Sequence, residues 1–348
     1  MQRKHIIYIA VLLLISVPGI FSCRKKSQPT PAPATDTVVL TPDTIKAPLY
    51  FPKPVIPDDN QPCKEIEKLG RMLYYDPILS NDGRFCGGCH IQGNGFTSLS
   101  LYNNVMPVLP HENLAWYTNF MWDGSKSGTL EDIMLFEVKE FFGTDLNKLN
   151  QSATYKPLFK NYFKTDTITY KEVAYSLAQF IRTLVCGSTK YDRSLRGLAI
   201  LTPDENMGSQ IFFTEKGDCF HCHVNPVMTD NLFHNTGLDS IYAKDADKGY
   251  YNVTGNPSDL GKFRTPNLRN VALKTHFMHD GRFTTLDEVI DFYDHEMYKV
   301  NNLDPIMSLP QKAQGLHLNS LQKSQLIAFL KTLTDSTFIT NPDFSNPH

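Results

Sequence analysis

Apolar side chains recur with a helical period in two distant segments of the chain. Residues 177–184 (LAQFIRTL) and 326–333 (LIAFLKTL) each place apolar residues at i, i+3, i+4 and i+7, which puts them on one face of a helix. Thr169 and Glu172 precede the first segment with the spacing of a capping box, which favours a helix start. Patterns typical of strands are sparse, so the sequence predicts an all-α fold of helices joined by long loops.

A second helical pattern, with a glycine and an aromatic pair, also occurs twice. LGRMLYY (69–75) is matched by MGSQIFF (207–213). The second copy follows Thr202 and Glu205, which again have the spacing of a capping box. Both copies lie well before one of the two apolar helices described above, so the order of the patterns is the same in each half of the chain.

A third repeated segment begins with Asp-Gly. WDGSKSGTLEDIMLFE (122–137) and HDGRFTTLDEVIDFY (279–293) share Asp-Gly, then Thr-Leu, then two acidic residues and an apolar run. Because the repeated patterns keep their order, we expect an internal duplication that produces two related domains. Their predicted bounds are 62–198 and 199–337, with a tail at 338–348.

Residues 1–22 have the pattern of an export signal. Arg3 and Lys4 precede an apolar run over residues 6–17 that is too short to span a bilayer; a short buried helix is the alternative. GIFSC then places a small residue before Cys23 and resembles a bacterial lipobox. We therefore expect an exported, periplasm-facing protein whose Cys23 is lipidated and anchors it to a membrane. Simple secretion with an unmodified Cys23 is the alternative.

Residues 23–61 are expected to be a tether between this anchor and the folded domains. Nine of the 22 prolines lie in residues 28–62, interleaved with Thr and Ala. Such a composition buries too little apolar surface to fold, and its prolines keep it extended. The formal net charge of −2 shows no basic excess over the whole chain, so nucleic acid is not expected as a partner.

Two C-x-x-C-H motifs carry the clearest chemical signal. They consist of Cys86, Cys89 and His90 in the first half, and of Cys219, Cys222 and His223 in the second. The motif is typical of covalent haem attachment: each thiol forms a thioether with the haem, and the histidine supplies an axial nitrogen to the iron. A four-cysteine zinc site is the alternative, but it leaves the histidine after each pair unexplained. The sequence therefore predicts one covalent c-type haem in each domain.

Cys63 and Cys186 lie outside these motifs. A disulfide between them fits an oxidising compartment, and two unpaired buried thiols fit the spacing equally well.

Three segments resemble the bacterial di-haem cytochrome c peroxidases and, within them, the branch of the methylamine dehydrogenase maturation protein MauG. These are LGRMLYYDPILS (69–80), FMWDG (120–124) and VTGNPSDLGKFRTPNLRNVALKTHFMHDGRFTTLDEVIDFY (253–293). The resemblance implies two helical cytochrome c domains. One haem would react with peroxide, and the other would store or relay electrons.

The resemblance assigns a role to several residues by position. His90 would be the proximal ligand of the peroxidatic haem, and His223 that of the electron-transfer haem. Trp122 matches a tryptophan that lies between the two haems and assists electron passage. A calcium ion between the domains is also implied, with Asn104 as the candidate side-chain ligand beside the backbone carbonyls of Lys274 and His276.

Tyr293 holds the position at which the peroxidases place a methionine ligand on the second haem. A tyrosine there is the choice of the MauG branch. A tyrosine oxygen is a harder donor than a methionine sulfur and favours oxidised iron. His295 and Met297 are nearby rivals for the same role.

The chain also departs from the family pattern at the first haem. The peroxidases carry a displaceable distal histidine in the loop that corresponds to residues 91–119, where this chain has only His111. The usual distal glutamate falls near Gly143. His111 and Glu112 are therefore secondary candidates for the group opposite the first haem.

The internal repeat supplies another candidate for that group. Glu137 lies as far after Leu130 as Tyr293 lies after Leu286. If the domains superpose, Glu137 faces the open side of the first haem, where a carboxylate can move a proton between the two oxygens of peroxide. A solvated charge on the helix surface is the alternative, and Glu140 is the nearest rival.

These patterns lead to a first functional hypothesis. We expect a di-haem peroxidase that reduces hydrogen peroxide to water with electrons from a small cytochrome or another reductant. The alternatives are a MauG-like oxidase that uses peroxide to oxidise a partner protein, and a di-haem electron-transfer cytochrome without turnover.

Overall fold

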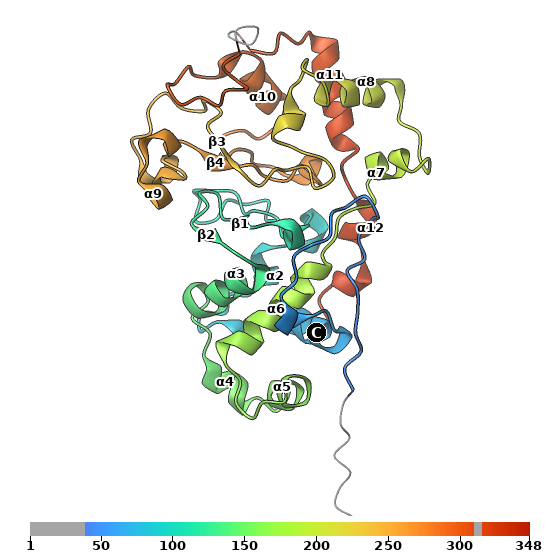
Figure 1. The fold of residues 1–348 in the computed structure, drawn as a ribbon, viewed down its shortest axis with the longest axis vertical. Coiled ribbons are helices and arrows are strands. Elements are labelled where there is room, and N and C mark those ends of the chain that lie inside the picture. Colours follow the sequence, from blue (N-terminus) through green and yellow to red (C-terminus); the bar gives the residue numbers. More distant parts are fainter. Residues whose placement is uncertain (1–38, 310–314) are drawn as a thin grey trace, which may run out of the picture. The chain divides into compact units, whose positions relative to one another are not determined.

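The chain folds into a helix-rich structure (Figure 1). A computed structural model describes residues 39–309 and 315–348, so the predicted export signal and Cys23 lie outside the described residues. One compact unit extends from Val38 to His348. Its helices are α1 (Lys64–Tyr74), α2 (Cys86–Cys89), α3 (Leu130–Phe136), α4 (Leu146–Gln151), α5 (Tyr155–Phe163), α6 (Tyr170–Thr183), α7 (Lys190–Leu195), α8 (Pro203–Phe212), α9 (Tyr251–Thr254), α10 (Leu286–Asp291), α11 (Ser320–Lys331) and α12 (Ser336–Ile339).

Two short antiparallel strand pairs accompany the helices. The pairs are β1 (Asn119–Phe120) with β2 (Lys126–Ser127), and β3 (Phe233–His234) with β4 (Phe263–Arg264). The fold is helix-rich, in line with the predicted all-α class, and these short strands are its β-structure within the described residues. Strands of two residues are too short to show the alternating pattern by which strands are recognised in a sequence.

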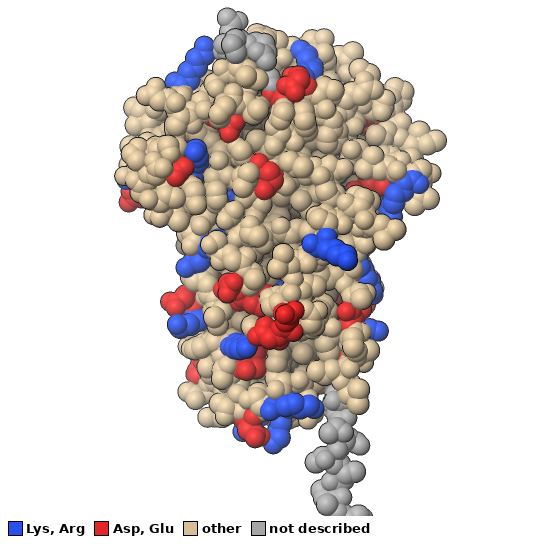
Figure 2. All heavy atoms as spheres, viewed as in Figure 1, with Lys and Arg blue, Asp and Glu red and all other residues tan. Residues whose placement is uncertain are grey.

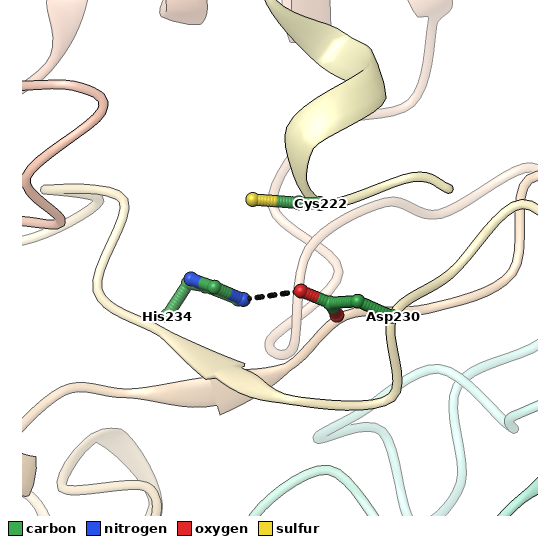
Figure 3. Close-up of side chains that lie close together, drawn as sticks. All are labelled: Cys222, Asp230 and His234. Atoms are coloured by element: carbon green, nitrogen blue, oxygen red, sulfur yellow. Dashed lines mark hydrogen bonds and ion pairs between the residues drawn. The ribbon is translucent and has the colours of Figure 1, made fainter.

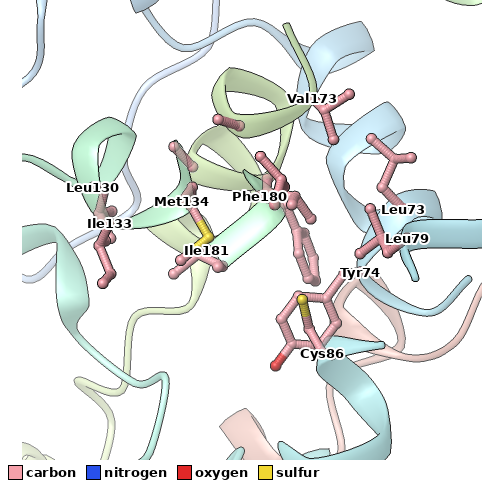
Figure 4. Packing of buried hydrophobic residues seen from close by; sticks show 14 of the residues in the cluster. Leu73, Tyr74, Leu79, Cys86, Leu130, Ile133, Met134, Val173, Phe180 and Ile181 are labelled. Atoms are coloured by element: carbon pink, nitrogen blue, oxygen red, sulfur yellow. The ribbon is translucent and has the colours of Figure 1, made fainter. Parts of the chain in front are cut away.

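The first hydrophobic core forms where α1 crosses α6. Gly70 makes this close crossing, since a Cβ atom there would lie 1.9 Å from the carbonyl oxygen of Ser176. The predicted capping box starts α6, because the backbone N–H of Thr169 donates to the Glu172 carboxylate at 2.8 Å. Figure 4 shows side chains of this core, which include Leu73, Tyr74, Leu79, Cys86, Leu130, Ile133, Met134, Val173, Phe180 and Ile181.

The second hydrophobic core forms where α8 lies beside α11 (Figure 1). Gly208 repeats the geometry of Gly70, because a Cβ atom added at this position would lie 1.9 Å from the carbonyl oxygen of Gln325. The capping box of Thr202 and Glu205 is also confirmed, with a hydrogen bond of 2.7 Å from the Thr202 N–H. Buried members of this core include Tyr191, Ile211, Phe212, Met228, Val271, Ile290, Leu326, Phe329 and Leu330.

The repeated Asp-Gly segments fold alike. Helix α3 begins at a capping box on Thr129, and α10 begins at one on Thr285. Each helix then passes into one turn of π-helix, over Glu137–Phe141 in the first case and Phe292–Glu296 in the second. Such turns widen the helix and re-aim its side chains, and they are frequent at functional sites.

The proline-rich residues 39–61 pack against the folded unit instead of continuing the predicted tether. Phe51 is buried and its ring lies 5.0 Å from that of Trp116. The Tyr50 hydroxyl donates to Asp192 at 2.7 Å. The tether was predicted to end at residue 61, and this boundary is therefore too far along the chain. Two aromatic residues supply the apolar burial that the overall composition of this segment did not suggest.

Asp192 also joins this segment to the second core. Its carboxylate accepts two hydrogen bonds from the guanidinium of Arg269, at 2.6 and 2.9 Å, and both side chains are fully buried. The backbone N–H and hydroxyl of Thr189 donate to the same carboxylate. Hydrogen bonds and the positive charge of Arg269 outweigh the effect of burial and lower the pKa of Asp192. In this buried ion pair, each charged group therefore has a partner of opposite charge and hydrogen bonds to it.

The predicted tail at 338–348 is packed as well. Phe338 belongs to the first hydrophobic core. The Arg71 guanidinium donates to the carbonyl oxygens of Pro342 and Ser345, and the Tyr75 hydroxyl donates to that of Phe344. The end of the chain therefore returns from the second core to cover α1.

Cys63 and Cys186 are both buried and are not joined by a disulfide. The Cys63 thiol donates to Glu65 at 3.1 Å, and the Cys186 sulfur accepts from the side chain of Asn270 at 3.4 Å. Burial raises the pKa of both thiols. Of the two alternatives left open by the sequence, the structure has the unpaired thiols.

Charged side chains of both signs are scattered over the face shown in Figure 2, with uncharged surface between them. No helix in the described part of the chain combines the length and apolar character needed to cross a membrane.

Candidate haem sites

The first C-x-x-C-H motif forms the short helix α2, with His90 directly after it. Nδ1 of His90 lies 3.1 Å from the carbonyl oxygen of Phe96, whose φ of 59° turns this carbonyl towards the ring. The bond places the proton on Nδ1, so Nε2 carries the lone pair that an iron ligand needs. Burial lowers the pKa of His90 to about 4, which keeps the imidazole neutral.

The second motif repeats this arrangement. Cys219–His221 forms a single turn, and His223 follows it. Nδ1 of His223 lies 3.3 Å from the carbonyl oxygen of Met228, and the φ of Met228 is 56°. Burial again lowers the pKa of this histidine to about 4. Both motifs therefore present a neutral imidazole in the tautomer that suits iron.

A cavity adjoins the second motif. Cys219, Cys222 and His223 line it, together with Tyr293, and its other walls are largely apolar. Burial, followed by the two motif cysteines Cys222 and Cys219, raises the pKa of the Tyr293 phenol. The structure thus brings Tyr293 to the same cavity as His223, whereas its rival His295 is exposed.

Trp122 lines the same cavity from the first half of the chain. Its Nε1–H donates to the carbonyl oxygen of Pro107 at 2.9 Å, and its own carbonyl oxygen accepts from the N–H of Arg264 in β4. These two bonds fix the indole at a junction between the first and second halves. Trp122, predicted to lie between the two haems, is thus found in the wall of the cavity of the second motif.

Glu137 lies near the first motif. It is the first residue of the π-turn after α3 and is half-buried. Burial raises the pKa of the Cys86 thiol, and the charge of Glu137 raises it further. Burial raises the pKa of Glu137 itself to about 7, although Arg84 and Lys126 oppose the shift. Its rival Glu140 is exposed beside Lys139, at 3.7 Å. Glu137 therefore lies near Cys86 of the first motif, and Tyr293 lines the cavity of the second.

Comparison with known proteins identifies the family. Residues 64–199 match the family model of the di-haem cytochrome c peroxidases. Methylamine utilization protein MauG of Methylorubrum extorquens is 31% identical over 296 residues, which cover 80% of each chain. The chain belongs to the di-haem cytochrome c peroxidase and MauG family. It is therefore an oxidoreductase of the cytochrome c peroxidase type.

Two further relatives agree with this assignment. Cytochrome-c peroxidase IdrP2 of Denitromonas iodatirespirans is 29% identical over 323 residues, with 80% of this chain and 84% of that protein covered. The crystal structure of a MauG-like protein associated with microbial copper homeostasis superposes with a TM-score of 0.76 at 31% identity. That match covers 87% of this chain and 99% of the other.

The residues present fit the c-type haem that the family implies. At each motif, two thiols about one helical turn apart stand beside a neutral histidine whose Nδ1 is already bonded. At the second motif these groups face a largely apolar cavity. Haem is a flat, mostly apolar group that needs two thiols, one nitrogen and such a cavity.

His111 does not take the side opposite His90. Its ring stacks on the His90 ring, with centroids 3.4 Å apart and planes at 15°. It therefore lies on the same side of the first site as the proximal histidine. Glu112 is fully buried and accepts a hydrogen bond from the side chain of Asn270. Of the two secondary candidates, His111 thus lies beside the proximal histidine, and Glu112 is engaged with Asn270.

Asn104 lies exposed in a turn of the loop before Trp122. This loop contacts the segment of Lys274 and His276, because the Thr275 hydroxyl donates to the carbonyl oxygen of Leu99 at 2.7 Å. The three residues implied as calcium ligands therefore lie on neighbouring segments.

A group that the sequence did not indicate surrounds His234 of β3. Its Nδ1 lies 2.6 Å from Asp304 and its Nε2 lies 2.8 Å from Asp230. Figure 3 shows His234 and Asp230 below the sulfur of Cys222. Burial disfavours a charged imidazole, but the two carboxylates outweigh it and raise the pKa of His234 to about 12. Two carboxylate partners require a proton on each ring nitrogen, so an imidazolium neutralised by two carboxylates lies beside the second motif.

Proposed function

We propose that the protein is an exported di-haem c-type peroxidase that reduces hydrogen peroxide to water with electrons from a small cytochrome or another reductant. The net reaction consumes two electrons and two protons for each peroxide and yields two water molecules. The observation that carries the proposal is the contrast between the two motifs: a titratable carboxylate, Glu137, lies near the first, and a phenol, Tyr293, lies at the second.

Each half of the chain would hold one covalent haem, through Cys86, Cys89 and His90 in the first and through Cys219, Cys222 and His223 in the second. Each haem, when bound, supplies an iron that exchanges electrons with peroxide or with a donor. The helix crossings at Gly70 and Gly208 have the same close geometry. This similarity supports a duplication with domains at 62–198 and 199–337.

Glu137 would act as the acid/base of the first site. As a carboxylate it accepts a proton from peroxide, and as a carboxylic acid it returns that proton to the departing oxygen. Its pKa of about 7 suits both halves of this cycle, because neither form is disfavoured at neutral pH. Partial burial supports this role, since a fully solvated carboxylate would remain ionised.

Tyr293 would fill the sixth position of the second site, so that peroxide does not react there. An oxygen donor stabilises the oxidised iron, and the second site would then be easier to oxidise than a methionine-ligated one. Trp122 would pass electrons between the two sites, and its position in the wall of the Tyr293 cavity supports this. Asn104, with the carbonyls of Lys274 and His276, would hold a calcium ion between the halves.

Tyr293 also favours a second candidate function, the MauG-like oxidation of a partner protein. One experiment separates it from the first. The protein is produced with its haems, the haem content is measured as pyridine haemochrome, and peroxide consumption is followed with a reduced small cytochrome c. Two haems per chain and steady turnover support the peroxidase. Reaction with peroxide without turnover of the cytochrome favours the oxidase, and no reaction at either haem leaves an electron-transfer cytochrome.

The proposed cellular location rests on the amino-terminal sequence alone. A lipid on Cys23 would hold the protein at a membrane and facing the periplasm. The wild-type protein should then sediment with membranes, and Cys23→Ala should move it to the soluble fraction while the haem content stays the same. A wild-type protein in the soluble fraction would remove the anchor and leave export intact.

A further inference from the structure

Two positively charged side chains flank the π-turn that begins at Glu137, one at each end. Helix α3 ends at Phe136, directly before the turn, and Nζ of Lys126 in β2 lies 3.8 Å from the centre of the Phe136 ring. Phe141 is the last residue of the turn, and the guanidinium carbon of Arg84 lies 4.7 Å from the centre of its ring. The face of an aromatic ring attracts a positive charge, so both cations are held close to the turn.

Arg84 also ties the turn to the first haem motif. It lies two residues before Cys86, and its Nη2 donates to the carbonyl oxygen of Phe141 at 3.0 Å. Its Nε donates to the carboxylate of Asp82 at 2.7 Å, which fixes a second edge of the guanidinium. The loop before the motif and the end of the π-turn are therefore joined directly through this side chain.

The charges of both flanking cations reach Glu137. Burial raises the pKa of Glu137 to about 7, and Arg84 and Lys126 both act in the opposite direction. Cys86 also faces this carboxyl, because burial and then the charge of Glu137 raise the pKa of its thiol. A cysteine sulfur that is bound to haem carries no charge. In the haem-loaded protein the two cations therefore remain as the side chains that favour the carboxylate form.

The other charged groups around the turn have partners of their own. Helices α3 and α6 pack against it. Their charged side chains are paired as follows: Glu131 with Arg182, Asp132 with Thr129, Lys171 with Asp59, and Glu172 with Thr169. On the turn itself, the exposed Lys139 lies 3.7 Å from the exposed Glu140. Lys139 is therefore a cation of the same turn that is engaged elsewhere.

The corresponding turn of the second half, Phe292–Glu296, is arranged differently. Its neighbouring cation is Lys323, which pairs with the carboxylates of Asp291 and Asp294 at 2.6 and 2.7 Å. Within the described residues, the flanking cations thus accompany the residue that is proposed to move protons, and not the residue that is proposed to bind iron.

We propose that Arg84 and Lys126 are positioning residues for the acid/base of the first site: they hold Glu137 at the first haem motif and keep its carboxylate form available. This inference rests on the proposed function, because both residues act through Glu137. The proton passes from peroxide to Glu137 and back to the departing oxygen, and neither cation takes part in that transfer.

The test is the pH profile of the second-order rate constant of the haem-loaded protein with hydrogen peroxide. Arg84→Gln and Lys126→Gln each remove one positive charge, so burial acts on Glu137 with less opposition. The inflection near pH 7 should therefore move upward by about one pH unit. At pH 7 the rate constant should fall roughly fivefold, because a smaller fraction of Glu137 is then ionised, and at pH 9 it should approach the wild-type value.

Three controls accompany these variants. Lys139→Gln removes a cation from the same turn and should leave the profile unchanged. Arg84→Lys and Lys126→Arg keep the charge and should keep the inflection near that of the wild type. In a Glu137→Gln background, Arg84→Gln and Lys126→Gln should have no further effect. Haem content and the spectrum of the second haem establish that each variant is folded and loaded, and Lys126→Gln carries the test if Arg84→Gln does not load haem.

The outcomes separate this inference from the proposed function. An inflection that stays near pH 7 in Arg84→Gln and Lys126→Gln overturns the role of the flanking cations and leaves the peroxidase intact. An equal shift in Lys139→Gln, or an undiminished effect in the Glu137→Gln background, does the same. If Glu137→Gln alone reacts at the wild-type rate, the acid/base role and this inference fail together.

Discussion

The Cβ atom of an alanine at position 70 would lie 1.9 Å from the carbonyl oxygen of Ser176. Helices α1 and α6 therefore meet in a contact that only glycine permits. We expect Gly70→Ala to lower the free energy of unfolding by about 1–3 kcal/mol or more, because the helices must move apart. Urea unfolding measures this. Gly93→Ala is the control, since a Cβ atom there meets nothing within 4 Å, and an unchanged midpoint for both variants would contradict the close crossing.

Removing the carboxylate of Asp192 should destabilise the protein strongly. Asp192→Ala leaves the guanidinium of Arg269 buried without its partner, for which we expect a loss of about 3–5 kcal/mol. The pKa of Asp192 is lowered in the folded state. The ion pair therefore contributes its full stabilisation to the free energy of unfolding above the ordinary aspartate pKa, and this stabilisation is lost as the pH falls through the lowered pKa.

Asp166→Ala is the matched control for this prediction. It removes the ion pair of Lys160 and Asp166, whose side chains are 62% and 83% exposed, and should leave the urea midpoint nearly unchanged. Equal effects of the two substitutions would contradict the structural role of Asp192.

Tyr293→Phe tests the sixth position of the second site. It keeps the ring and removes the oxygen, so the low-spin absorption spectrum should change and the second haem should become easier to reduce. A redox titration followed by absorption measures both effects, and the haem content should stay the same. An unchanged spectrum would transfer the role to Met297 or His295.

The reaction with peroxide should depend on pH through Glu137. Burial raises the pKa of this carboxyl to about 7, and the carboxylate is the form that accepts a proton from peroxide. Below pH 7 the rate constant should therefore fall about tenfold per pH unit, and above pH 7 it should level off. Stopped-flow measurements between pH 5 and pH 9 check this. The same profile in Glu137→Gln would assign the titration to another group.

Much of the local structure could be predicted from the sequence. The capping boxes of Thr169 and Thr202, the helices that follow them and both haem motifs depend on spacings within a few residues. The rest depends on partners far apart in the chain. His234 and Asp304 are 70 positions apart, and Tyr50 and Asp192 are 142 apart. No local pattern marks such pairs, so the charge beside Cys222 and the packing of residues 39–61 were not foreseen.

The position of His111 illustrates the same limit. The sequence offered it only as a secondary candidate for the group opposite the first haem. Its ring stacks on that of His90, and two residues later the left-handed Asn113 bonds the backbone of Cys186 through both its amide nitrogen and its amide oxygen. This contact spans 73 positions, so only the folded chain decides which side His111 takes.

The role proposed for Glu137, the acid/base at the peroxide site, can be measured through the second-order rate constant of the haem-loaded protein with hydrogen peroxide. Glu137→Gln keeps the size of the side chain and removes its ionisable group. We expect the rate constant at pH 7 to fall by ~10²–10⁴-fold, with the haem content and the spectrum of the second haem unchanged, while Glu140→Gln reacts like the wild type. A wild-type rate in Glu137→Gln would exclude Glu137 as the acid/base.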